Sequence, residues 1–350
     1  MNHSNHGFNI LIRCDGSSKI GMGHVTRCLA LANDLVSNLN SSVIFAMHSH
    51  ELGVEKIKKS FPVTVKDKTE QITEVEWIIG IVKEKKVDAL VLDIRHQLCA
   101  NDLIEIKQRT DVVISSIDDP EDKRLVCDLV FYPPIVQVKE MNWQGFKGRL
   151  FTGWNYVSIA KEFVFSQGRN KSGCYKIMVS MGSTDPLNMT ASVIEALTFL
   201  NANFHAYIII GKGNKNLFRI KSDLCKVKFS YTLVEDPPFM IDYMLASNFA
   251  VISFGHTAYE LAAVGVHTLI LSLTDDHNRS AFVFEEFDLG ISLGVFEKAS
   301  LNQIVEGLKD LISLPSNDSK RIHFEPSIGK EIINHINNEK GLHRSPGPNT

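Results

Sequence analysis

Short apolar runs alternate with longer amphipathic segments along the first half of the chain. The short runs have the length and composition of buried strands, and they predict strands at residues 8–12, 43–47, 89–93 and 112–115. The longer segments carry apolar residues at every third or fourth position, which predicts helices over residues 25–39, 72–82 and 103–106. Strands that alternate with helices in this way are typical of a parallel, doubly wound sheet.

The same alternation restarts after residues 166–173, a polar, glycine-bearing segment without periodicity that we interpret as a linker. Further strands are predicted at 176–181, 206–210, 249–252 and 268–271, with helices between them and a last helix over about 330–337. We therefore expect an α/β protein of two Rossmann-like, doubly wound domains, at 1–165 and 174–340, that face each other across a central cleft. The polar tail at 341–350 is expected to be disordered.

The composition is that of an ordinary soluble protein. Of the 350 residues, 44% are hydrophobic and 22% are charged, and the net charge of −3 offers no basic face for nucleic acid. No apolar run reaches the ~18 residues of a membrane span, and the N-terminus lacks a secretory pattern. The six cysteines are scattered, which favours reduced thiols over disulfides or a zinc site. We expect a cytoplasmic monomer that acts on a small molecule, without stable membrane insertion.

Residues 15–27 form the most informative motif of the chain, because they join the first predicted strand to the first predicted helix. Open α/β sheets bind their ligands at this edge. Gly21 and Gly23 allow a ligand to approach the N–H groups of the helix start closely. His24 is expected at the first helical position, where the helix dipole favours the neutral imidazole that a general base requires. The structural alternative is a tight turn with a surface histidine. A dinucleotide fingerprint is not indicated, since Arg27 stands where its third glycine would be.

Three further strand-to-helix turns in the second half carry polar motifs. Residues 182–186 present backbone amides suited to phosphate, or else Ser183 or Asp185 caps the next helix. At the second turn, Thr257 is suited to a pyrophosphate and Glu260 to both ribose hydroxyls.

A capping box formed by Thr257 and Glu260 is the structural alternative at that second turn. The third turn, residues 274–278, contains two aspartates and a histidine. This turn lacks the additional spaced ligands of a recognisable metal motif, so we predict no metal site there.

These motifs, in this order, resemble those of the UDP-2,4-diacetamido-2,4,6-trideoxy-β-L-altropyranose hydrolases of pseudaminic acid synthesis and of related spore-coat polysaccharide proteins. The resemblance runs over about residues 8–315. It rests on residues 13–15, 21–24, 27–32, 117–119, 127–130 and 181–186, with Gly153, Tyr156, Glu162, Phe163, Asn188, Thr190, Ser253, Gly255, Thr257, Glu260, Gly265 and Val266.

The resemblance implies a GT-B fold in which His24 is the base and water displaces UDP at the anomeric carbon, without a metal or cofactor. The residues implied on the sugar and water side are Asp15, Gly21, Gly23, Arg27, Asp93, Tyr156, Asp276 and His277. The residues implied on the nucleotide side are Gly182, Ser183, Asp185, Gly255, His256, Thr257 and Glu260.

Two other functions stay open. An inverting GT-B glycosyltransferase would use the same base on a sugar or lipid-linked hydroxyl, and should expose an apolar or basic patch near His24. Residues 56–61 are a candidate for this patch, although we favour a solvated helix end as their explanation. A sugar-nucleotide-binding protein without turnover is the third possibility. The chain departs from the family's usual pattern at residues 94–96, Ala160, His267 and 275–277, so the nucleotide half of the resemblance is the closer half.

Overall fold

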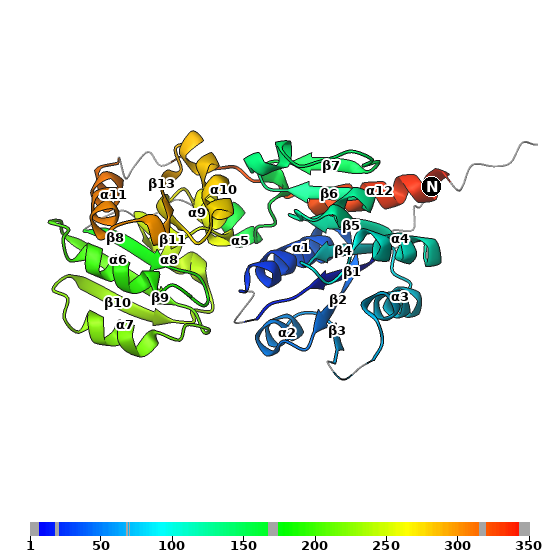
Figure 1. Cartoon of the computed structure of the whole chain (residues 1–350), viewed down its shortest axis with the longest axis horizontal. Coiled ribbons are helices and arrows are strands. Elements are labelled where there is room, and N and C mark those ends of the chain that lie inside the picture. The colour runs from blue at the N-terminus through cyan, green and yellow to red at the C-terminus, as the bar shows by residue number, and fades with distance from the viewer. Residues whose placement is uncertain are drawn as a thin grey trace, which may run out of the picture. The chain divides into compact units, whose positions relative to one another are not determined.

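The computed structural model describes residues 7–17, 21–67, 69, 71–166, 174–314 and 320–342. The chain divides into two compact units. Unit 1 comprises residues 1–134, 138–160 and 325–350, and unit 2 comprises residues 135–137 and 161–324. Each unit contains one parallel sheet with helices packed on its faces (Figure 1).

The sheet of unit 1 has the order β3-β2-β1-β4-β5-β6-β7 among the described residues, and all neighbouring strands are parallel. Its strands are β1 (Asn9–Cys14), β2 (Ser42–His48), β3 (Val63–Lys66), β4 (Ala89–Asp93), β5 (Val113–Ile117), β6 (Leu129–Tyr132) and β7 (Arg149–Thr152). The strand order reverses between β1 and β4, so the carboxyl ends of these two strands border the position where such sheets bind ligands.

Helices cover both faces of the first sheet. The helices of unit 1 are α1 (Gly23–Leu39), α2 (Glu51–Lys58), α3 (Glu74–Lys85), α4 (Ala100–Arg109) and α12 (Ile328–Leu342), with short 3-10 turns at η1 (Asp122–Val126), η2 (Val136–Lys139) and η3 (Trp154–Tyr156). The core on one face joins α1, α2 and α12 to alternate residues of the strands, as the period of two in a strand requires. Figure 1 shows α3 and α4 on the other face.

Unit 2 repeats this architecture, with the order β10-β9-β8-β11-β12-β13 in the part of the chain that is described. Its strands are β8 (Tyr175–Ser180), β9 (Phe204–Ile210), β10 (Ser230–Glu235), β11 (Phe249–Ser253), β12 (His267–Ser272) and β13 (Gly290–Val295). Its helices are α5 (Lys161–Val164), α6 (Met189–Leu197), α7 (Leu217–Leu224), α8 (Met240–Ala246), α9 (His256–Val264), α10 (Asp275–Glu286) and α11 (Leu301–Ser313), with η4 (Phe296–Lys298). The buried side chains of α6, α7 and α11 pack on one face of the sheet.

The two parallel sheets confirm the expected fold class, α/β with two Rossmann-like domains of the GT-B type. Five strands were not predicted, namely β3, β6, β7, β10 and β13. All five lie at or next to the edges of their sheets. Strand β10 is the clearest case of an edge strand that needs few apolar residues, since four of its six residues are exposed.

The domain boundary differs from the expected one at the C-terminal end. Residues 325–340 were assigned to the second domain, but α12 belongs to unit 1. The physical reason is its apolar stripe, because Ile328, Ile332 and Ile336 are buried in the core of unit 1. The contact is close enough that a Cβ at Gly329 would lie 2.8 Å from the Leu39 side chain.

The expected linker and the expected disordered tail lie mostly outside the residues that the structure describes. Residues 167–173 of the expected linker lie outside the described residues, as do residues 343–350 of the expected disordered tail. Gly341 and Leu342 are instead the last residues of α12. Every helix in the described part of the chain is too short or too polar to cross a bilayer.

Candidate functional site

His24 lies at the carboxyl edge of the first sheet, beside the last residue of β4. Gly21, with φ of 86°, makes the turn that precedes the helix, and Met22 is the residue before the first helical position. His24 is therefore the second residue of α1, one position later than expected. Because β1 pairs with β4, with Cys14 opposite Asp93, the Asp93 carboxylate reaches the helix start. His24 Nδ1 lies 2.5 Å from Asp93 Oδ1.

Arg27, one turn after His24, holds the same carboxylate with two hydrogen bonds. Its Nε donates to Asp93 Oδ2 and its Nη2 donates to Asp93 Oδ1, both at 2.6 Å. Asp93 is only 1% exposed. Burial by itself would raise the pKa of Asp93, but the charge of Arg27 and the contact with His24 outweigh it and hold the pKa well below its usual range. Asp93 is therefore ionised across the physiological pH range.

An ionised Asp93 fixes the proton of the imidazole. A carboxylate only accepts hydrogen bonds, so the contact requires the proton of His24 on Nδ1. Nε2 is then the nitrogen that can accept a proton, and the side chain remains 19% exposed. This is the arrangement of a general base oriented by a carboxylate.

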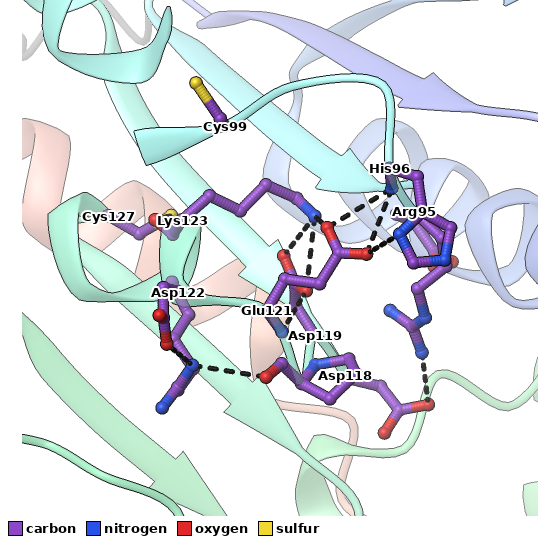
Figure 2. Close-up of polar contacts among 12 residues, drawn as sticks. Arg95, His96, Cys99, Asp118, Asp119, Glu121, Asp122, Lys123 and Cys127 are labelled. Carbon is purple, nitrogen blue, oxygen red and sulfur yellow. Dashed lines mark hydrogen bonds and ion pairs between the residues drawn. The ribbon is translucent and has the colours of Figure 1, made fainter. Parts of the chain in front are cut away.

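Two charged residues that were not predicted as site residues complete the cluster. Asp118 follows β5 directly, in the left-handed conformation with φ of 53°. Its Oδ2 accepts a hydrogen bond from Arg27 Nη1 at 2.9 Å and lies 3.7 Å from Arg95 Nη2. Figure 2 shows Arg95 and Asp118 with this ion pair between them. A carboxylate close to the C-terminal end of a predicted strand, as Asp93 also is, was the sequence signal that could have identified Asp118.

The carboxylate of Asp15, a residue expected on the sugar and water side, is bound by other groups of the protein. Its carboxylate pairs with buried Arg13 at 2.9 Å and accepts a hydrogen bond from the backbone N–H of His48 at 2.8 Å. Asp15, His48 and His50 also place possible metal-ligand atoms within 4.8 Å of one another, which the sequence did not predict. A cation there would share Asp15 with the positive charge of Arg13, which disfavours it.

Gly21, Gly23 and Tyr156, three of the residues expected on the sugar and water side, have different surroundings. A Cβ at Gly21 or Gly23 would meet open space, in keeping with a ligand approaching the backbone there. Tyr156 instead packs in the aromatic cluster with Phe131 and Phe151, at ring-centroid distances of 5.9 and 5.2 Å. Burial raises the pKa of Tyr156 above its ordinary value.

In unit 2, the turn after β8 is built around Asp185. Its carboxylate accepts hydrogen bonds from the N–H groups of Met189 at 2.8 Å and Thr190 at 3.1 Å, so it caps α6, as one of the two alternatives predicted. Gly182, with φ of 79°, lies where a Cβ would be 3.6 Å from Ser253 Oγ. The turns after β8 and β11 are therefore neighbours.

The turn after β11 is different, because no side chain caps its helix. α9 begins at His256, with Gly255 as its N-cap, and no capping hydrogen bond from a side chain is present there. The predicted capping box of Thr257 and Glu260 is thus wrong, since Thr257 already lies inside the helix. Glu260 is buried near His256, with 4.0 Å between its Oε1 and Nε2 of the histidine. A Cβ at Gly255 would meet open space, so the helix start is accessible.

The turn after β12 has a structural explanation. The Thr274 hydroxyl accepts a hydrogen bond from the backbone N–H of His277 at 3.2 Å and so caps α10. The side chain of Gln137 donates to the backbone oxygen and to Oδ1 of Asp276, each at 3.0 Å. The imidazole of His277 packs beside Phe254.

The chain was compared with known proteins, and no family model matches it. It is 24% identical over 291 residues to the spore coat polysaccharide biosynthesis protein SpsG of Bacillus subtilis, covering 82% of this chain and 84% of that protein. It is 31% identical over 192 residues to the UDP-2,4-diacetamido-2,4,6-trideoxy-β-L-altropyranose hydrolase of Campylobacter jejuni, covering 54% of this chain and 65% of that protein. These two relatives confirm the resemblance found in the motifs.

The solved structures support the same fold. The crystal structure of MurG from Acinetobacter baumannii matches with a TM-score of 0.70 at 13% identity, over 95% of this chain and 99% of that one. At this identity the likeness concerns the fold alone, and it agrees with the GT-B architecture.

Proposed function

We propose that this protein is a nucleotide-sugar-processing enzyme of surface polysaccharide or nonulosonic acid biosynthesis, and specifically a hydrolase that releases UDP from a UDP-linked deoxy-acetamido sugar. The observation that carries the proposal is the contact of His24 with Asp93, whose carboxylate is held ionised by Arg27. The similarity to the Campylobacter jejuni hydrolase supports the choice of substrate class.

In the proposed reaction, His24 activates a water molecule on the sugar side. The water oxygen attacks the anomeric carbon while one of its protons passes to His24 Nε2. The bond between the anomeric carbon and the diphosphate oxygen breaks, and its electron pair leaves with UDP. A single displacement without a covalent intermediate inverts the anomeric configuration. Asp93 stabilises the imidazolium that forms, and Arg27 keeps Asp93 ionised throughout.

UDP is proposed to bind unit 2 at the neighbouring turns after β8 and β11. The N–H groups at the start of α9 are positioned to bind phosphate oxygens, because the N-cap residue Gly255 leaves space before them and has no side chain to cap them. Glu260 is proposed to accept hydrogen bonds from the ribose hydroxyls. Asp185 acts there by shaping the turn, since its carboxylate is occupied by the N–H groups of α6.

Glycosyl transfer is the alternative, because a base such as His24 deprotonates a sugar hydroxyl as readily as water. The candidate patch at residues 56–61 does not separate the two functions. Lys56 and Lys58 are exposed in the last turn of α2, and Lys56 Nζ donates to Thr26 Oγ1 of α1 at 3.2 Å, whereas Phe61 packs against Phe45 of the core, with 5.6 Å between ring centroids. A basic patch near His24 and a solvated helix end both account for these lysines.

The test is release of free UDP from a panel of UDP-sugars, measured with and without candidate carbohydrate acceptors. We expect release without an acceptor and inversion of the anomeric centre, observed by NMR. His24→Gln should lower turnover by ~10²–10⁴ with UDP affinity retained. His205→Gln, a histidine bonded to Ser230 and Thr232 in unit 2, is the matched control. Release that requires an acceptor would assign a transferase, and tight UDP-sugar binding without release would assign a binding protein.

A further inference from the structure

Arg95 is a charged residue beside the proposed base that the mechanism above does not use. It follows Asp93 by two positions, after buried Ile94, in the segment between β4 and α4. Its guanidinium lies 3.7 Å from Asp118, which also binds Arg27, and Arg27 in turn binds Asp93. Arg95 is thus linked through three successive ion pairs, by way of Asp118 and Arg27, to the carboxylate that orients His24.

The guanidinium of Arg95 has unused hydrogen-bond donors. Among the described residues its Nη1 is buried without a hydrogen-bond partner, and the contact of Nη2 with Asp118 is an ion pair beyond hydrogen-bond length. The side chain is still 30% exposed, so a ligand can reach the guanidinium at its exposed atoms, although Nη1 itself is buried.

The segment that carries Arg95 is held in place by a buried ion-pair cluster. His96 adopts φ of 61°, and its backbone N–H donates to both oxygens of Glu121 at 3.1 and 3.2 Å. Glu121 also accepts a short hydrogen bond from Lys123, which is fully buried and lies 3.1 Å from Asp119 (Figure 2). The backbone that carries Arg95 is therefore anchored before a ligand arrives, which lowers the entropy cost of ordering this segment on binding.

The local charge count indicates which kind of oxygen Arg95 would bind. Arg27 and Arg95 carry two positive charges, and Asp93 and Asp118 carry two negative charges within the same chain of contacts. Because these charges balance, the cluster has no excess positive charge that would attract an additional anion. A neutral carbonyl oxygen, which only accepts hydrogen bonds, matches an unused N–H donor without changing this balance.

We propose that Arg95 determines sugar specificity by donating from its guanidinium to the carbonyl oxygen of an acylamino substituent on the sugar. The inference rests on the proposed function, because it takes the sugar to lie beside His24. It assigns Arg95 to recognition of the substituent, whereas His24 and Asp93 serve the reacting carbon.

The test compares UDP-N-acetylglucosamine with UDP-glucose, two probes that differ in an acetamido group and a hydroxyl group. The variants are Arg95→Gln and Arg95→Lys, and the control is Arg109→Gln, which removes an arginine paired with Glu76 and Glu105 on the same unit. The measurements are kcat/KM for UDP release and calorimetric affinity for each sugar nucleotide and for UDP.

We expect Arg95→Gln to weaken binding and kcat/KM for the acetylated probe by roughly 10- to 150-fold, the range for a hydrogen bond to a charged group. The affinity for UDP-glucose and for UDP should change by less than about threefold, because neither molecule has an acylamino group that Arg95 could bind. Lysine should restore little of the loss, because its ammonium does not reproduce the planar fork of Arg95.

An equal loss of affinity for both sugar nucleotides, or a loss of affinity for UDP alone, would overturn the assignment. A wild-type protein that binds the acetylated probe no more tightly than UDP would also overturn it. A wild-type preference for UDP-glucuronate that Arg95→Gln abolishes would also overturn it. If the wild type releases no UDP but binds the acetylated probe through Arg95, the proposed hydrolysis fails while the role of Arg95 holds.

Discussion

Replacing Asp93 by asparagine separates the chemistry of the candidate site from its packing. The side chains have almost the same shape, but asparagine is neutral and offers one acceptor oxygen in place of two. In the structure, both oxygens of Asp93 are in use, one by His24 and Arg27 and the other by Arg27 and the Cys28 thiol. Whichever way the amide turns, an NH₂ group faces an N–H of Arg27.

The contacts give the size of the effect. Breaking a buried ion pair from one side costs about 3–5 kcal/mol, and the lower end applies here because Arg27 keeps its bond to Asp118 at 2.9 Å. About 3 kcal/mol corresponds to a melting temperature lower by ~6–12 °C for a unit of this size. Turnover should fall by ~10²–10⁴, since the amide neither fixes the proton on Nδ1 nor stabilises the imidazolium.

The assay measures turnover, UDP affinity and melting temperature on Asp93→Asn and on His24→Gln together. His24 is partly exposed and loses one hydrogen bond, so its variant should lose turnover with less than about half of the destabilisation. An Asp93→Asn variant that has a lower melting temperature but keeps turnover within a few-fold of wild type would refute the reasoning. Asp93 would then be a buried structural partner of Arg27 and not part of the base.

The remaining predictions concern the nucleotide, metal and acid dependence. Glu260→Ala should weaken UDP binding by roughly 10- to 150-fold in calorimetry, because two charge-assisted hydrogen bonds to ribose are lost, and unchanged affinity would remove the ribose assignment. Turnover should survive EDTA, and a loss that magnesium or manganese restores would direct attention to Asp15, His48 and His50. Burial alone would raise the pKa of Glu74, but the His48 hydrogen bond and the charge of Arg13 lower it to about 2. The stabilisation of the folded state by ionised Glu74, about 1–3 kcal/mol once solvent screening is allowed for, should therefore be complete above the usual pKa of a glutamate and disappear as pH falls towards 2. Urea unfolding of Glu74→Gln and wild type should differ near neutrality and converge in acid.

The sequence predicts the centre of each sheet better than its edges. Central strands such as β1, β4 and β11 are buried on both faces, so their composition is mostly apolar and identifies them. Edge strands such as β10 expose many of their residues, and their polar composition hides them. Helix α12 was predicted as a helix, but the unit that receives its apolar stripe is decided by tertiary packing.

The sequence predicted those residues of the candidate site that lie in a recognisable motif or at the end of a predicted strand. His24, Arg27 and Asp93 were all named, but their mutual contact follows from the pairing of β1 with β4, which no local pattern encodes. Asp118 and Arg95 were missed for a similar reason, because their approach depends on the register of β4 and β5 and on the left-handed φ at Asp118. The capping box at Thr257 failed because Gly255 starts the helix earlier.

The return of α12 to unit 1 has a consequence for biosynthesis. Unit 1 is assembled from the two ends of the chain, and nearly all of unit 2 is one continuous segment between them. During translation, residues 161–324 emerge complete while the core of unit 1 still lacks Ile328, Ile332 and Ile336. Unit 2 is therefore expected to reach its native state first on the ribosome. A stop codon before α12 should leave unit 2 folded and unit 1, which contains His24, open to proteolysis.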